Sequence, residues 1–576
     1  MLVKPTVRRP PSLLADVGIV AFLVALLCGL LRIAKHWQAP LQPHVEIELS
    51  LWALPGYTVL SLLRGVTAYG ISLIFAITYG YLAARRPAAE RVMIPLLDVL
   101  QSIPVLGFLP GAVLALMALF PRTNTGLELA SILMIFTGQV WNMAFSVYQS
   151  LRSVPAALQE ASALYQFNWW QRFRRVELPA TAVGLAWNSM LAMAGGWFFL
   201  MVCEAFTLGT RDFKLPGLGA YISVAIAQHR VPAICAGMTA MVLMIIVVDT
   251  AIWRPVLVWA QKFRMEETAT GDAQTSLVLS WLSRSSLIRS AMDRVAHPIS
   301  EWLASSSSPF PRASPRRAAP LQHAPPTPIG RLVPLVSVGV TAGVVVWALW
   351  LLWRMLAHLP PQEWGHVIGA TLWTSVRVFG AIAIGSLWTV PVGIWIGSSD
   401  RRRTRWQPFV QVAASFPAPM LYPLVLFVLH QVGWGLHVGA VVLMLLGTQW
   451  YILFNVIAGA SAVPNELREV ARSFRFTSVQ QWLRVWWPAV FPYLVTGWVT
   501  AAGGAWNASI VAEYVSLGPH ETFIAPGLGS LISLAASQNH YDLLTAGVLS
   551  MALVVVLINR FLWRPLYQLA EHRVAS

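Results

Sequence analysis

Charged residues are scarce in this chain of 576 residues: they make up 11% of the sequence, whereas hydrophobic residues make up 57%. Soluble domains carry about 25% charged residues, so the composition excludes an ordinary soluble protein and indicates a polytopic membrane protein. The formal net charge is nevertheless +16. The basic residues fall between apolar runs rather than in one patch. They therefore indicate charge retained on the inner side of a membrane, and we expect no nucleic-acid partner.

Cysteine and lysine are also scarce. The three cysteines, Cys28, Cys203 and Cys235, lie in apolar segments without metal-ligand spacing, which favours packing roles over a disulfide framework or a metal site. A phosphate-binding P-loop requires Gly-x-x-x-x-Gly-Lys followed by Ser or Thr, and none of the four lysines completes one. Hydrolase elbows and His-Glu-x-x-His motifs are absent too. We therefore expect no enzyme activity, and no cofactor bound by this chain.

Long apolar runs dominate the sequence instead. A membrane span needs about 20 apolar residues, because a helix rises about 1.5 Å per residue across about 30 Å of hydrocarbon. Such runs form two groups of six, near 14–34, 62–84, 100–120, 128–150, 180–206 and 233–253, and near 332–354, 370–397, 408–430, 436–458, 489–515 and 543–563. We therefore predict an all-α integral membrane protein with about twelve spans.

The distribution of arginine predicts the orientation of these spans. Arginines cluster after spans two, four, eight and twelve, which by the positive-inside rule places both termini in the cytoplasm. Arg211, Lys214 and Arg230 on the predicted outer side are the main exceptions. No small-residue cleavage site follows the first run, so we expect a retained helix rather than a signal peptide.

The stretch between the two groups of runs has a different composition. Residues 305–328 are rich in Ser, Pro, Ala and Arg and indicate a disordered linker. Before them, over 277–302, leucines and tryptophans are interleaved with arginines, which fits either a basic amphipathic helix on the inner leaflet or a simple tether. We therefore expect one transmembrane domain at 1–255, a cytoplasmic linker at 256–330 and a second transmembrane domain at 331–576.

The two halves repeat each other at separations of 309 to 313 residues. The matched pairs include Pro155 and Pro464, Glu160 and Glu469, Arg64 and Arg377, Trp197 and Trp506, Glu204 and Glu513, and Pro216-Gly217-Leu218-Gly219 and Pro526-Gly527-Leu528-Gly529. Internal repeats of this length indicate a duplicated unit. Six spans return the chain to the same side, so the halves should be parallel repeats around a path between them.

One repeated segment resembles the cytoplasmic EAA loop of ABC-importer permeases, of the nitrate, sulfonate, taurine and bicarbonate type. The residues that carry the resemblance are Glu160-Ala161-Ser162, Trp170-Gln171-Arg172-Phe173-Arg174-Arg175-Val176 and Leu178-Pro179-Ala180. Arg64, Glu204 and Gly217-Leu218-Gly219 are also similar to that group. The resemblance covers both six-span units and implies two type I importer domains fused in one chain of the bacterial inner membrane.

In that family the EAA loop forms a coupling helix that fits a groove on an ATPase subunit. The resemblance thus implies coupling helices at 156–172 and 465–481, two partner ATPase subunits that bind ATP and Mg, and a periplasmic substrate-binding protein. The implied coupling residues are Glu160, Ala161, Arg172, Arg174, Glu469, Arg472, Arg475 and Arg484. The chain departs from the family at Gln166 and Arg475, where glycine is usual, and at Val470, where alanine is usual. These departures put the turn between the short helices in doubt.

Polar and aromatic residues in the spans are candidates for the translocation path. They are Arg64, Arg377, Asn188, Asn507, Trp197, Trp506, Glu204 and Glu513. Guanidinium groups suit oxyanion binding, although snorkelling to headgroups is the alternative. The glutamates either gate the path or make structural hydrogen bonds at the membrane edge. The tryptophans either close a pore or serve ordinary packing.

These features predict a permease that forms the path for a small anion such as nitrate, bicarbonate or a sulfonate. Two alternatives stay open. One is a secondary transporter driven by an ion gradient through Glu204 and Glu513, and the other is a non-transporting membrane scaffold or sensor. The doubled basic loop favours the importer, since a secondary transporter would not need it.

Overall fold

The computed structural model describes residues 46–102, 105–208, 211–263, 343, 346–347, 349–516 and 522–575. The expected span at 14–34, most of that at 332–354, and the linker beyond residue 263 lie outside the described residues. Elsewhere the described chain is helical, apart from two short antiparallel hairpins of strands, β1 with β2 and β3 with β4. This agrees with the all-α prediction.

The elements of the first half follow one another from residue 54 to residue 263. They are α2 (Leu54–Arg85), α3 (Pro87–Ser102), η1 (Val105–Phe108), α4 (Leu109–Leu119), α5 (Thr125–Arg152), α6 (Ala156–Leu164), α7 (Trp169–Arg172), η2 (Phe173–Glu177), α8 (Leu178–Glu204), β1 (Ala205–Leu208), β2 (Arg211–Lys214), α9 (Leu218–Ala227), α10 (Val231–Val248), η3 (Asp249–Trp253), α11 (Arg254–Ala260) and η4 (Gln261–Phe263).

The second half repeats this order, except that the described residues contain no counterpart of η4. Its members are α16 (Pro361–Gly397), α17 (Asp400–Ser415), η6 (Ala418–Leu421), α18 (Tyr422–Gln431), α19 (Leu436–Ser461), α20 (Asn465–Ser473), α21 (Ser478–Gln481), η7 (Trp482–Trp486), α22 (Trp487–Ala512), β3 (Tyr514–Ser516), β4 (Thr522–Ile524), α23 (Leu528–Ser537), α24 (Tyr541–Ile558), η8 (Asn559–Trp563) and α25 (Arg564–Ala575). Even the π-helical turns η2, η3, η7 and η8 stand in matched places.

Seven helices of the described chain are long and apolar enough to cross a membrane. They are Leu54–Arg85, Thr125–Arg152, Trp169–Glu204, Val231–Phe263, Pro361–Gly397, Leu436–Ser461 and Tyr541–Ala570. Helix α22 runs through the expected span at 489–515 but does not count among the seven. It carries Gly503, Gly504 and Asn507 and packs against α16 and α19, so it need not be uniformly apolar.

Two expected spans are not single straight helices. The span expected near 408–430 consists of α17 and η6–α18, which are bent by 78° at a break next to Pro417. Proline removes a backbone donor and clashes with the preceding turn, which explains the break. The span expected near 100–120 is likewise divided among the end of α3, η1 and α4. In sequence, Pro104 matches Pro417 at the 313-residue separation.

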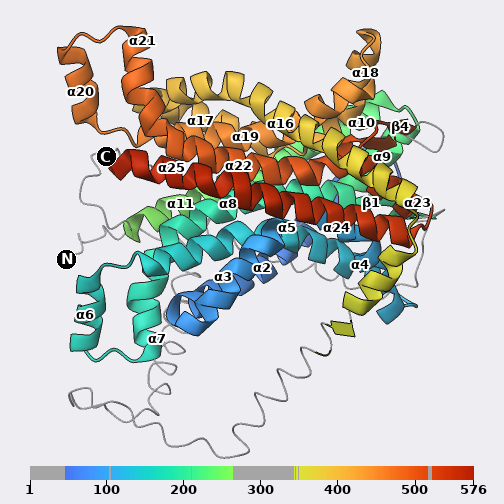
Figure 1. Cartoon of the computed structure of the whole chain (residues 1–576), viewed down its shortest axis with the longest axis horizontal. Helices are drawn as coiled ribbons and strands as arrows, with labels where there is room; N and C mark the ends of the chain where they lie inside the picture. Colours follow the sequence, from blue (N-terminus) through green and yellow to red (C-terminus); the bar gives the residue numbers. More distant parts are fainter. Residues whose placement is uncertain are drawn as a thin grey trace, which may run out of the picture.

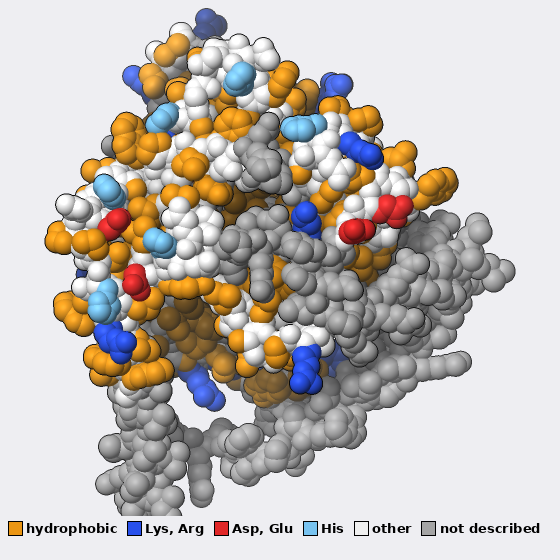
Figure 2. All heavy atoms as spheres, turned by 90° about the vertical axis from the view of Figure 1, so that its right-hand side faces the viewer, with side chains coloured by type: hydrophobic (Ala, Val, Ile, Leu, Met, Phe, Trp, Pro, Cys, Tyr) orange, Lys and Arg blue, Asp and Glu red, His pale blue; other side chains and the backbone are white. Residues whose placement is uncertain are grey.

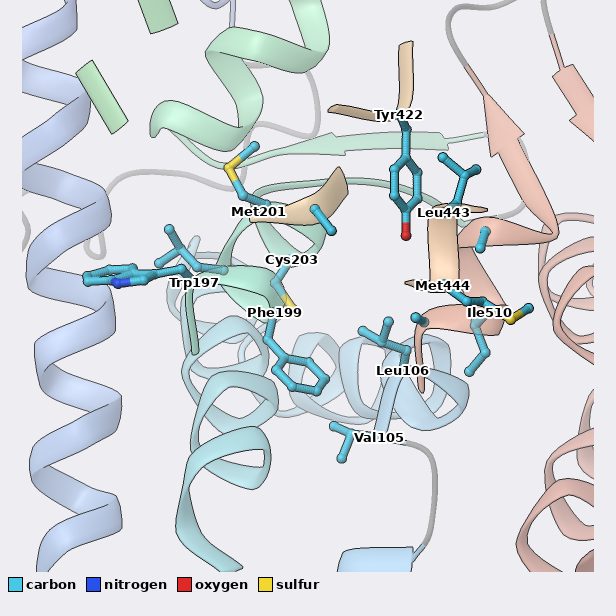
Figure 3. Close-up of a cluster of buried hydrophobic side chains, with 14 of the residues drawn as sticks. Val105, Leu106, Trp197, Phe199, Met201, Cys203, Tyr422, Leu443, Met444 and Ile510 are labelled. Atoms are coloured by element: carbon cyan, nitrogen blue, oxygen red, sulfur yellow. The ribbon is translucent and has the colours of Figure 1, made fainter. Parts of the chain in front are cut away.

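In each half a central helix packs between two others: α5 between α2 and α8, and α19 between α16 and α22. The elements of the two divided spans contact the opposite half. Thus η1 contacts α22, η6 and α17 contact α8, and α3 contacts α24. The main hydrophobic core therefore runs through both halves, and Figure 3 shows Val105 and Leu106 of the first half beside Met444 and Ile510 of the second.

The molecule has two chemically different ends. Both pairs of short helices, α6 with α7 and α20 with α21, project at the left-hand end in Figure 1, and the strand hairpins lie at the opposite end. We call these the helical-hairpin end and the strand end. Figure 2 faces the strand end and shows basic, acidic and histidine side chains spread singly among apolar ones.

Candidate functional site

A buried ionic cluster joins three elements of the first half near the strand end. The Arg64 guanidinium in α2 donates from Nη1 to Glu204 at the end of α8, and from Nε and Nη2 to the two oxygens of Glu128 in α5, both at 2.7 Å. Arg64 is 3% exposed and Glu204 is fully buried. Removing Arg64 would leave the carboxylates of Glu128 and Glu204 uncompensated in the protein interior.

The same carboxylate holds the start of α9. The Gly219 N–H donates to Glu204 Oε2 at 2.7 Å, and the Leu218 N–H donates to the Ser61 hydroxyl, which itself donates to Glu204 at 2.6 Å. A Cβ at Gly217 would overlap the Glu204 carboxyl group. The repeated Pro-Gly-Leu-Gly element is therefore a helix start whose free backbone donors are satisfied by a buried glutamate.

The second half builds the matching cluster with one carboxylate fewer. Arg377 Nη1 lies 2.8 Å from Glu513 Oε1, and the Glu513 carboxylate accepts from Thr374 and from the Gly529 N–H. The position of Glu128 is taken by His437, whose backbone carbonyl accepts from Arg377 Nε at 3.3 Å. The first cluster thus contains two carboxylates for one guanidinium, and the second contains one.

These contacts show how the predicted path residues lie. The structure brings Arg64 together with Glu204, and Arg377 together with Glu513, with the guanidinium N–H groups directed at protein acceptors. A role for the arginines in attracting an anion stays a prediction. The sequence missed Glu128, although its place in the repeat, 309 residues before His437, aligns it with the second cluster.

The predicted aromatic and amide residues have separate surroundings. Trp197 and Trp506 are both buried, and a Cβ at Gly65 would lie within 2.9 Å of the Trp197 ring. Asn507 accepts from the Val105 N–H of the opposite half at 2.7 Å, whereas Asn188 donates to Gly184 in its own helix at 3.0 Å. The two asparagines are therefore not equivalent, and only Asn507 joins the halves.

A second contact between the halves was not predicted. Asp249 in η3 is buried and accepts from the side chain of Gln411 in α17, and it also accepts from Arg254 Nε at 3.1 Å. The cavity beside this contact, next to Trp197 and Met190, holds only about 10 Å³. That volume is close to the minimum for one water molecule, so the seam between the halves is closed here.

The sequence contains a signal for this contact. By the separations of the repeat, Gln411 corresponds to Asp98 and Asp249 corresponds to Asn559. At both positions the first half thus carries an acid and the second half carries an amide. This shared change from acid to amide is the sequence signal for the contact.

The two helical hairpins have the same backbone. Gln166 and Arg475 both adopt a left-handed conformation, with φ of 51°, two residues after the ends of α6 and α20. The next residue in each turn, Phe167 or Phe476, donates its N–H to the carbonyl five positions earlier, at 3.0 Å. The two hairpins therefore share one turn conformation, with a non-glycine residue at the left-handed position of each.

The predicted coupling residues lie mostly on exposed faces of these hairpins. Ala161 is half-buried, and the others on those faces are exposed: Glu160, Arg174, Glu469, Arg472, Arg475 and Arg484. Large apolar side chains lie beside them, with Leu164 83% and Phe474 72% exposed. Exposed apolar side chains rimmed by charges are typical of a docking surface.

The base of each helical hairpin, where the short helices meet α8 or α22, is held by different contacts in the two halves. At the first, the buried Glu177 carboxylate binds Arg85 of α2 and lies 2.8 Å from Arg172 Nε. At the second, Trp486 takes the place of Glu177, and Arg468 lies over its ring at 5.3 Å. Of the predicted coupling residues, Arg172 is thus an anchor of the hairpin rather than a free surface charge.

Metal-ligating side chains do not gather within the described residues, where no group of three or more His, Cys, Asp or Glu could hold an ion. Cys203 is buried and Cys235 is exposed, and neither forms a disulfide. Cys28 lies outside the described residues. The chemistry that the described chain offers is thus ionic anchoring, helix capping and docking.

Comparison with known proteins gives two matches to a single family model. The model is described as binding-protein-dependent transport system inner membrane component, and it matches residues 76–252 and 389–574. The matches fall within the two domains expected from the sequence, at 1–255 and 331–576. They confirm the resemblance that the repeated EAA-like segments predicted.

Individual relatives match about one third of the chain. The chain is 27% identical over 212 residues to the bicarbonate transport system permease protein CmpB of Synechococcus elongatus, which covers 36% of this chain and 73% of that protein. It is 25% identical over 196 residues to the nitrate import permease protein NrtB of Synechocystis, which covers 34% and 67%. A putative aliphatic sulfonates transport permease protein SsuC of Bacillus subtilis is 26% identical over 149 residues, which covers 26% of this chain and 51% of that protein.

Proposed function

The chain belongs to the family of binding-protein-dependent transport system inner membrane components, as a duplicated and fused ABC-importer permease, and we propose that it carries a small anion into the cell. Its relatives are named for bicarbonate, nitrate and aliphatic sulfonates, and these substrates share a compact oxyanion group. The proposed substrate is therefore nitrate, bicarbonate, a sulfonate or a similar small anion.

The observation that carries the proposal is the pair of projecting helical hairpins. Both display charged residues next to exposed apolar side chains, and both lie at the same end of the molecule (Figure 1). Two such surfaces would receive two copies of an ATPase subunit, on which ATP and Mg would be bound. The helical-hairpin end would then face the cytoplasm, and we propose both termini on that side, as the distribution of arginine predicts.

The opposite end would meet a periplasmic substrate-binding protein. There the strand hairpins and the starts of α9 and α23 are tied to the spans by the two buried Arg–Glu clusters. Each cluster would move as a rigid unit with its half. Access would then alternate by separating the halves along the seam at Asp249 and Gln411, which is closed in this structure.

The gradient-driven alternative receives no support from the glutamates. Glu204 and Glu513 are buried and ion-paired to arginines in their own halves, rather than lining an open path. The scaffold or sensor alternative has no structural observation that favours it. Transport coupled to partner ATPases therefore remains the best-supported function.

The test is co-purification with ATPase subunits from native membranes. We compare the wild type with Glu160→Arg/Glu469→Arg, and use Glu363→Arg, at the start of α16 and away from both hairpins, as the matched control. The wild type and the control should retain two ATPase subunits and support ATP hydrolysis in nanodiscs, whereas the double variant should lose both. Failure of the wild type to retain any ATPase would overturn the proposal.

A further inference from the structure

A polar cavity of about 250 Å³ lies at the base of the second helical hairpin, between α17, α20 and η7. Its lining includes Ser398, Arg402, Arg468, Arg472, Gln481 and Trp486. Three arginines thus face one space, and none of its described lining residues is acidic. A water molecule takes about 30 Å³ of liquid, so the cavity has room for an anion with several oxygens and some water.

Arg468 is held in place by neutral groups. Its Nη1 and Nη2 donate to the carbonyls of Ser398 and Ala460, at 3.2 and 3.0 Å, and its guanidinium lies over the Trp486 ring. Its Nε is buried and has no hydrogen-bond partner in the described chain. Burial, together with nearby Arg403 and Arg472, lowers the pKa of Arg468, although Asp400 opposes this.

The other two arginines also lack a carboxylate in the lining. Arg402 donates from Nη2 to the Ser398 hydroxyl at 3.0 Å and lies over the Trp395 ring, and Arg472 is exposed. The nearby Asp400 is 90% exposed at its side chain and pairs with Arg403 at 2.8 Å. Converging cations repel one another unless an anion lies between them.

The first half shows what such an anion does. There the buried Glu177 carboxylate lies between Arg85 and Arg172, at the positions that Trp486, Ser398 and Gln481 occupy in the second half. The base of the first hairpin thus carries its own anion, the Glu177 carboxylate. The second base gathers arginines from other positions, and a tryptophan replaces the carboxylate.

We propose that the cavity at the base of the second hairpin binds a small oxyanion, which takes the place of the Glu177 carboxylate. Arg402, Arg468 and Arg472 supply the positive charge, and guanidinium groups bind oxyanions through paired N–H donors. The bound anion ties α20 to α17, as Glu177 ties the first hairpin to α2. Its source is either a free anion such as phosphate or the phosphate of an anionic lipid headgroup.

The experiment measures thermal unfolding of the full chain in detergent. Inorganic phosphate is titrated against chloride at constant ionic strength, because a ligand of the folded state raises the Tm. The wild type should gain stability with phosphate. Arg472→Gln should need at least about tenfold more phosphate, since a lost charge-assisted hydrogen bond weakens binding by that order. Arg174→Gln in the first hairpin is the control and should respond as the wild type does.

A pair of substitutions at Trp486 tests the site by charge alone. Trp486→Glu and Trp486→Gln lose the same ring, and only the first supplies a carboxylate. Trp486→Glu should unfold at a higher temperature than Trp486→Gln without phosphate, and should show no further gain with it. Equal phosphate responses in these two variants would overturn the proposal.

Lipid titration identifies the source of the anion. If phosphatidylglycerol, but not phosphatidylcholine, stabilises the delipidated protein and Arg472→Gln weakens that effect, the headgroup is the ligand. If inorganic phosphate suffices, the ligand is a free anion. The proposal fails if neither one stabilises the wild type. None of these outcomes depends on the transported substrate or on ATPase binding, so the site can fail while the proposed function stands.

Discussion

Glu128 in α5 and His437 in α19 occupy matched positions, and only Glu128 places a carboxylate against the buried arginine of its half. Arg64 therefore has two carboxylates, whereas Arg377 depends on Glu513 alone. Both arginines are almost fully buried. The two clusters consequently differ in what happens when one acid is neutralised.

Neutralising the glutamate that both clusters contain, Glu204 or Glu513, should lower stability more in the second half. Glu513→Gln leaves Arg377 without a carboxylate, which should cost about 3–5 kcal/mol of stability, the typical loss when one partner of a buried pair is removed. Glu204→Gln removes the same helix-capping oxygen from α9 but leaves Arg64 paired with Glu128, so its loss should be smaller. Thermal unfolding followed by tryptophan fluorescence measures both. Equal losses would show that Glu128 does not compensate.

The glycine that touches the buried carboxylate should not tolerate a methyl group. In Gly217→Ala the new Cβ would overlap the Glu204 carboxyl, so we expect a loss of about 1–3 kcal/mol, as for overpacked cores. Gly56→Ala is the control, because no atom lies within 4 Å of a Cβ there. The measurement is again the unfolding midpoint. A Gly217→Ala protein as stable as the control would contradict the described contact.

The contact between Asp249 and Gln411 should depend on having one acid and one amide. Gln411→Glu places two carboxylates together across the seam and should weaken the association of the halves. Adding Asp249→Asn restores an acid–amide pair in the exchanged order and should recover most of the loss. A double-mutant cycle of unfolding free energies should give a coupling of about 1–2 kcal/mol. Additive effects would mean that the two side chains do not interact.

The left-handed residues of the helical hairpins should be replaceable by glycine with a gain in local stability. A side chain in this conformation costs about 1–2 kcal/mol, part of which glycine recovers despite its greater freedom in the unfolded chain. Gln166→Gly and Arg475→Gly should therefore slow amide hydrogen exchange in α6 and α20, as measured by mass spectrometry. The β-branched Gln166→Val should accelerate exchange in α6. Faster exchange in the glycine variants would contradict the observed turn.

Local signals predicted most of the architecture. Apolar runs located the spans, and the repeat located both hairpins, because each depends on nearby residues alone. Breaks next to prolines were also visible, since Pro104 and Pro417 recur at matched places inside two expected spans. We nevertheless predicted one span at each place, because total length and hydropathy agree with a single crossing.

Contacts between helices were harder to predict. Nothing near Asn507 indicates that it accepts from Val105, which lies 402 residues away in the chain. Arg64 was predicted either to attract an anion or to snorkel to the headgroups, and neither prediction included its carboxylate partners, which come from two other helices. Such partnerships depend on how tilted helices pack, and a single sequence records them only where the two halves differ together at both positions, as at Asp249 and Gln411.

The unlike hairpin bases have a mechanical consequence. If the proposed ATPase partners are identical, they would act on hairpins that are held differently: a buried ion pair holds the first, and an arginine stacked on an indole holds the second. Equal forces would therefore give unequal displacements. A permease made of two identical chains has two identical hairpin bases, because each change in its gene appears twice in the assembly. Fusion removes that constraint, so the stiffness of each hairpin base can change independently of the other.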